Sequence, residues 1–189
     1  MTIEAWRITG QSQIDSYVGR WVELAVLLVN ELYVARAHGR PADPPADRRV
    51  ALEEAFIRQG WTPSRALTGA DADRLAGVAA ELHSVFAGDV ATLNEALVRH
   101  GAVPNLHGDP PVLAFHAPGA DLVDAWAADA ATALAMVIGV GQGRRLRSCE
   151  ADGCELVFMD VTRNASRRFC GLSCQNRAKA SAYRARRRT

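Results

Sequence analysis

The sequence predicts an α+β protein in two parts: an α-rich globular domain over residues 1–143 and a small cysteine-bearing module over residues 144–189. Apolar residues in the first part recur at helical spacing, between residue types that begin and end helices. All four cysteines of the chain lie between residues 149 and 174. With 49% apolar residues the chain has ample material for a core, so a disordered protein is not expected.

The first elements are a short strand and a long helix. Residues Glu4–Ile8 predict the strand. Residues Ser16–His38 predict the helix, and a proline-rich loop, "GRPADPPADRR", follows it. Asn30 is a polar residue within the apolar helical run. We interpret it as a buried side chain with satisfied hydrogen bonds, and a contact to a ligand is the alternative. The apolar stripe of this helix comprises Trp21, Leu24, Leu28, Leu32 and Ala35.

Four further helices are predicted, each beginning at an aspartate that can accept hydrogen bonds from the free N–H groups of the first turn. Between the third and fourth of them, two apolar runs flank the turn "GDPP" and predict a hairpin. The predicted helix-capping residues are Asp47, Asp71, Asp89 and Asp121. The corresponding helices end near Gly60, Gly88, Gly101 and Ile138.

Nothing in residues 1–143 has the pattern of a catalytic or phosphate-binding motif, so we expect a domain that senses a ligand or partner rather than an enzyme. Its histidines lack metal-ligand spacing such as His-x-x-x-His. We interpret each of them as a surface or core residue. They are His38, His83, His100, His107 and His116.

The sequence also bears on location. The apolar run Trp21–Val34 carries two glutamates and an asparagine, and it is shorter than the ~20 residues a membrane span needs. The N-terminus lacks the basic stretch and apolar run of a signal peptide. We therefore expect a cytoplasmic protein, and a reducing compartment disfavours structural disulfides.

The spacing of the cysteines, Cys-x4-Cys-x15-Cys-x3-Cys, suits one tetrahedral metal ion bound by two close pairs of thiolates. Zinc is the natural ion for four thiolates with no open position, at one ion per chain, and its binding would supply the folding energy of this small segment. An iron–sulfur cluster or a redox dithiol is the alternative. The predicted ligands are Cys149, Cys154, Cys170 and Cys174.

Local patterns between and after the two pairs predict a hairpin and a helix. Residues Leu156–Val161 predict a strand, residues 162–166 a turn, and Arg167–Cys170 the return strand. A helix follows Cys174, and the glycine-rich stretch Gly139–Arg145 is expected to be a hinge before the module.

Charge divides the chain at the same boundary. Residues 1–143 hold 10 Arg against 17 acidic residues, whereas residues 144–189 hold 12 basic residues against 4 acidic ones. Such a basic module indicates a polyanion partner, and we expect duplex DNA. The alternatives are a protein-interaction adaptor that docks an acidic partner, or an unstructured basic tail. The predicted DNA contacts are Arg163, Arg167, Arg168, Arg177, Lys179, Arg184, Arg186, Arg187 and Arg188.

The segment "CEADGCELVFMDVTRNASRRFCGLSCQNRAKASAYRARRR" resembles the CGNR zinc finger, whose Cys-Gly-Asn-Arg motif stands here as Cys174, Gln175, Asn176 and Arg177. The chain departs from the family at Gln175 and in the three-residue gap between Cys170 and Cys174, where four residues are common. The upstream region, including "LLVNEL", is similar to the ABATE domain that precedes this finger. The resemblance implies a treble-clef-like finger in a stress-induced transcription regulator.

Overall fold

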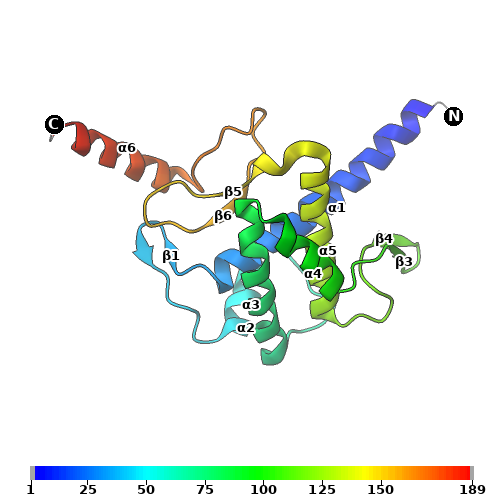
Figure 1. The fold of residues 1–189 in the computed structure, drawn as a ribbon. Helices are drawn as coiled ribbons and strands as arrows, with labels where there is room; N and C mark the ends of the chain where they lie inside the picture. Colours follow the sequence, from blue (N-terminus) through cyan, green and yellow to red (C-terminus); the bar gives the residue numbers. More distant parts are fainter. Residues whose placement is uncertain (1–2, 188–189) are drawn as a thin grey trace.

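The protein is described from a computed structural model, with the backbone of residues 3–187 and the side chains from residue 15 onward. Five helices form the first part of the chain, and the long first and last helices project from it on opposite sides (Figure 1). The helices are α1 (Ile3–Leu32), α2 (Arg48–Gln59), α3 (Gly69–His83), α4 (Val90–Arg99) and α5 (Leu122–Val137), with a 3-10 turn, η1 (Ser84–Ala87), after α3.

Helix α5 lies at the centre of the core. Its alanines, such as Ala130 and Ala131, are fully buried, because their small side chains let α1, α3 and α4 pack closely around it. The apolar face of α1 lies against this helix and contributes Leu24 and Leu28, both fully buried. The expected stripe on α1 is confirmed except at Ala35, which is exposed beyond the end of the helix.

Two hairpins connect the helices. The first, β1 (Arg36–Ala37) and β2 (Arg40–Pro41), turns at residues 38–39. The second, β3 (Asn105–His107) and β4 (Val112–Ala114), confirms the predicted hairpin and is antiparallel with Leu106 opposite Leu113.

Three of the four predicted capping aspartates are confirmed. Asp47, Asp89 and Asp121 each accept hydrogen bonds from backbone N–H groups in the first turns of α2, α4 and α5. The prediction for Asp71 was wrong by one turn, because Thr68 caps α3. The two residues form a capping box, in which Thr68 accepts from the Asp71 N–H and Asp71 accepts from the Thr68 N–H.

The strand predicted at Glu4–Ile8 was also wrong, because these residues belong to α1. Once a helix has formed, each added residue gains a backbone hydrogen bond, whereas a strand needs a partner. Within the described residues, no strand lies beside this segment. Helix α1 ends at Leu32 instead of His38, and Tyr33 and Val34 both donate to the Val29 carbonyl there.

A buried polar network fixes α1 to α5. The carboxylate of Asp129, 1% exposed, accepts from the Tyr17 hydroxyl at 2.8 Å and from the Phe115 N–H at 2.7 Å, and His116 Nδ1 lies 2.8 Å away. Burial and the adjacent Asp129 raise the pKa of Tyr17. The hydroxyl therefore remains a donor, as a buried carboxylate requires.

Within the described residues, the helix that is long and apolar enough to cross a membrane is Leu122–Arg145, with a mean hydropathy of 1.5. Its most apolar window is 61% buried inside the protein, so this is the signature of a core helix. The sequence analysis had instead considered Trp21–Val34 and found it too short.

Candidate metal centre and basic surface

The C-terminal module begins with two short turns and a strand pair. A π-turn, η2 (Ile138–Gln142), and a 3-10 turn, η3 (Gly143–Arg145), lead into β5 (Leu146–Ser148), which pairs antiparallel with β6 (Val157–Met159). Helix α6 (Leu172–Arg186) closes the module. The strand predicted within Leu156–Val161 is therefore confirmed as β6.

The return strand predicted at Arg167–Cys170 was wrong, because β6 pairs with β5 instead. The segment after β6 folds around the fully buried carboxylate of Asp160, which accepts from the Thr162 hydroxyl at 2.6 Å and from the Arg167 N–H at 2.6 Å. Arg145 donates to the Asp160 carbonyl at 2.8 Å. Burial alone would raise the pKa of Asp160, but these hydrogen bonds and Arg145 outweigh it and lower the pKa. Hydrogen bonds to the ionised Asp160, rather than strand pairing, therefore hold this segment in place.

The four cysteines come together, all with free thiols. Cys149 and Cys154 flank a tight turn between β5 and β6, and Cys174 lies in the first turn of α6. The Sγ atoms of Cys154 and Cys170 are 3.8 Å apart, and those of Cys170 and Cys174 are 3.5 Å apart. The Cys170 N–H donates to Cys149 Sγ at 3.4 Å.

These distances fit a metal ion. Tetrahedral zinc with Zn–S bonds of ~2.3 Å places neighbouring sulfurs about 3.8 Å apart. Cysteine thiols at this spacing can therefore serve as ligands of such an ion. A metal ion bound here would supply much of the folding energy of the finger, since its own buried cluster comprises little more than Ala151 and the cysteines.

One donor was missed by the sequence analysis. His38, at the tip of the β1–β2 hairpin, places Nδ1 3.4 Å from Cys174 Sγ and 4.0 Å from Cys170 Sγ. Its ligand atom and those of Cys154, Cys170 and Cys174 all lie within 4.8 Å of one another. His38 is 111 positions before the first cysteine, so spacing along the chain carries no signal of this contact.

Three of the predicted DNA contacts bond to other groups of the protein, although Arg168 is itself exposed. Arg167 donates to the Phe169 and Cys170 carbonyls and lies over the Phe158 ring. Arg168 is paired with Glu150 at 2.5 Å. Arg177 donates to the Asp152 carbonyl at 2.8 Å, and its Nη2 lies 3.8 Å from Cys174 Sγ.

The other predicted contacts lie on the surface. Arg163, Lys179 and Arg184 are exposed, and they form no ion pair within residues 15–187. Arg187 is exposed and stacks on Tyr183, and Arg186 is exposed on the same helix. Arg188 lies outside the described residues.

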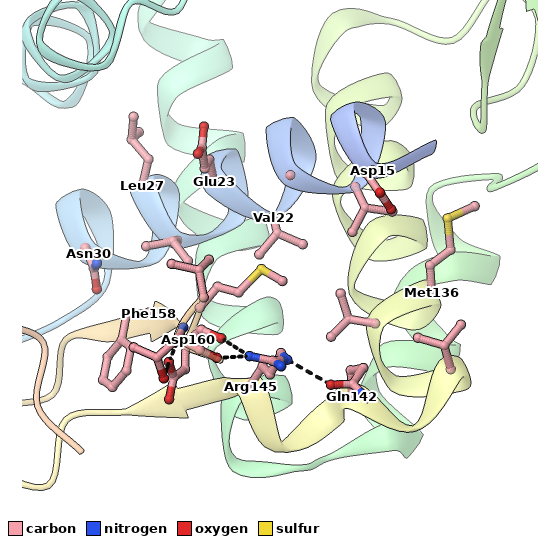
Figure 2. A pocket seen from close by; sticks show the side chains of 18 of the residues that line it. Asp15, Val22, Glu23, Leu27, Asn30, Met136, Gln142, Arg145, Phe158 and Asp160 are labelled. Carbon is pink, nitrogen blue, oxygen red and sulfur yellow. Dashed lines mark hydrogen bonds between the residues drawn. The ribbon is translucent and has the colours of Figure 1, made fainter. Parts of the chain in front are cut away.

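A cavity of about 1160 Å³ lies between α1, the end of α5 with η2, and the loop after β6, and the sequence analysis did not foresee it. Valines and Leu27 of α1 form one wall, and Met136 and Val140 form the second. Residues 158–163 form the third (Figure 2). Arg145 reaches from this side to Gln142 and to the Asp160 carbonyl.

Asn30 lies at the edge of this cavity and joins α1 to β6. Its side-chain N–H donates to the Val157 carbonyl at 3.0 Å, and its oxygen accepts from the Val157 N–H at 2.9 Å. The predicted hydrogen bonding of Asn30 is confirmed, but its side chain is partly buried rather than buried.

Comparison with known proteins agrees with this geometry. No curated protein matches the chain. The model of the CGNR zinc finger matches residues 145–187, the span that holds β5, β6, α6 and all four cysteines. The C-terminal module of this α+β protein is therefore a CGNR zinc finger.

Proposed function

We propose that the protein binds duplex DNA through this finger, with one zinc ion per chain, and that the first part of the chain senses a ligand or partner. The observation that carries the DNA proposal is the group of exposed cations on one small module. Arg163 lies in the loop after β6, and Lys179 and Arg184 lie on α6. No acidic residue follows Asp160, so none lies between these cations or after them in the sequence.

The placement of α6 supports the same function. The helix projects from the body of the protein (Figure 1), so its exposed side chains can follow a phosphate backbone without a clash from the helical domain. Its first turn holds Cys174, so the metal centre fixes the base of the helix while the basic end extends outward.

The internal contacts divide the arginines by role. Arg167 donates to carbonyls beside the metal centre, and Arg177 lies next to Cys174 Sγ, so we assign both to holding the finger together. We assign the exposed cations without such contacts to phosphate binding. They are Arg163, Lys179, Arg184 and Arg187. If each neutralised one phosphate, the slope of log K against log salt concentration on duplex DNA would be about −4.

The test measures binding of the zinc-loaded full chain to random duplex DNA across a salt series. Arg184→Ala should weaken binding and reduce the salt slope by about one unit. Arg58→Ala, which removes an exposed arginine paired with Glu31 in the helical domain, is the matched control and should change neither. A parent protein that does not bind DNA at low salt would contradict the proposal and favour an adaptor for an acidic protein.

The cavity between α1 and the finger supports the sensing role. It is lined mainly by apolar side chains, and its walls come from both parts of the chain. A molecule bound there would contact α1 and the loop that carries Arg163 together. Ligand occupancy would therefore change the position of a DNA-contacting residue.

A further inference from the structure

We propose that His38 is an exchangeable fifth donor of the metal centre, which replaces Cys149 and ties the ion to the helical domain. The inference rests on the metal centre proposed above and is independent of DNA binding. A tetrahedral site needs four donors, and the donor atoms of His38, Cys154, Cys170 and Cys174 all lie within 4.8 Å of one another. Cys149 Sγ, which accepts from the Cys170 N–H at 3.4 Å, is a fifth donor beside this group.

The hairpin that carries His38 is held against the finger by backbone hydrogen bonds. The Gly39 N–H donates to the Gly153 carbonyl at 2.9 Å, and the Glu155 N–H donates to the Arg36 carbonyl at 2.9 Å. Gly39 adopts a φ of +81°, and a Cβ there would lie 1.6 Å from Arg177 Nη1. The positive φ favours glycine at this position, and the turn sets His38 beside the thiols.

The distances suit a histidine ligand. A Zn–N bond of ~2.0–2.1 Å and a Zn–S bond of ~2.3 Å, at tetrahedral angles, place nitrogen and sulfur about 3.6 Å apart. The His38 Nδ1 lies 3.4 Å from Cys174 Sγ and 4.0 Å from Cys170 Sγ. The imidazole thus lies beside the shared thiols, with the Ser173 hydroxyl 3.2 Å from Nδ1, and it would reach the ion when the Cys149 bond opens.

The exchange conserves atoms and changes the charge by one unit. The bond from zinc to Cys149 Sγ breaks, and the released thiolate takes a proton from water. The lone pair of neutral His38 Nδ1 forms the new bond. Zinc with four thiolates carries a net charge of −2, and zinc with three thiolates and an imidazole carries −1.

The consequence is a metal-mediated link between the two parts of the chain. In the four-cysteine state every ligand belongs to residues 149–174. In the state with histidine, the ion bridges the finger and the β1–β2 hairpin, which follows α1 directly. A shift of α1 that withdraws the hairpin therefore favours the four-cysteine state.

The experiment titrates the full chain with Co²⁺, whose absorption separates thiolate from imidazole ligands. Cys149→Ser should still bind one Co²⁺, with the spectrum of three thiolates and one nitrogen. Adding His38→Ala should weaken its affinity by at least the roughly 10–100-fold that loss of an outer-shell partner costs. Adding His107→Ala, an exposed histidine on β3, is the matched control and should have no effect.

Equal Co²⁺ affinity in Cys149→Ser with and without His38 would overturn the proposal, and so would loss of metal from Cys149→Ser alone. A second measurement keeps all four cysteines and records transfer of zinc to excess chelator. His38→Ala should release zinc about tenfold faster than the parent protein, because the three-thiolate intermediate loses its fourth donor. An unchanged release rate would likewise contradict the exchange.

Discussion

The helical domain and the finger are stabilised by different means. Leucines and alanines fill the first around α5, and side chains such as Leu75 and Leu134 are fully buried. The finger has little apolar material of its own, and its fold depends on thiols at metal-binding distance and on the buried carboxylate of Asp160. The larger region therefore folds by excluding water, whereas we expect the smaller one to depend on a bound ion.

The two regions nevertheless pack directly against each other. Leu146 of β5 and Val157 of β6 belong to the apolar core of the helical domain, and Asn30 bonds both backbone groups of Val157. The strand pair of the finger is thus packed on α1. Independent folding of residues 1–143 stays a prediction, and the three changes below probe how separable the regions are.

Loss of the metal should have the largest effect. Binding of structural zinc to small fingers is worth about 10–16 kcal/mol, so Cys174→Ser should unfold α6 and abolish metal binding while the helical domain stays folded. Circular dichroism measures the lost helix, and tryptophan fluorescence reports only the domain, because all four tryptophans precede residue 127.

Leu172→Ala, in the same turn and 76% exposed, is the matched control for Cys174→Ser. A simultaneous loss of both signals in Cys174→Ser would show that the domain needs the folded finger. The difference drawn between the two regions would then be wrong.

Asn30→Ala tests the contact between the two regions and should have an intermediate effect. The change leaves the N–H and carbonyl of Val157 without partners, which costs about 1–3 kcal/mol of unfolding free energy. Urea unfolding, followed by tryptophan fluorescence and by metal release, measures this loss of stability. We expect the finger of Asn30→Ala to unfold at a lower urea concentration than that of the parent protein. Glu23→Gln, two turns earlier on the same helix and exposed, should leave both transitions in place. Unchanged unfolding of Asn30→Ala would mean that apolar packing alone joins the regions.

The smallest of the three effects should come from acidification, which lowers the stability of the helical domain by protonating Asp71. The hydrogen bond from Arg65, and then that from the Thr68 N–H, lower the pKa of Asp71 below its ordinary value. Its stabilisation is therefore fully present above about pH 4, the usual range for the unfolded carboxyl, and is lost as the pH falls through the lowered pKa.

Urea unfolding between pH 6 and pH 3, followed by tryptophan fluorescence, should show a shallower loss of stability for Asp71→Asn than for the parent protein. Asp73→Asn removes a neighbouring exposed carboxyl and controls for net charge. Parallel pH profiles for the parent and Asp71→Asn would show that the capping box adds no acid sensitivity.

Several features followed from the sequence alone, because they depend on neighbours along the chain. A capping aspartate acts on N–H groups two or three residues away, so Asp47, Asp89 and Asp121 were recognisable. The clustering of four cysteines as two close pairs predicted one metal centre for the same reason, and the CGNR match at residues 145–187 agrees with it.

Only the tertiary structure revealed the contacts between distant residues. His38 meets the thiols, β5 rather than Arg167–Cys170 pairs with β6, and Arg177 turns inward beside Gly39. The contacts of His38 and Arg177 join residues more than 100 positions apart and leave no periodic trace in the chain, and the β5–β6 pairing accompanies the packing of both strands on the helical core. The sequence therefore determined which residues could bind metal or phosphate, and packing decided which of them are directed toward the metal centre and which toward solvent.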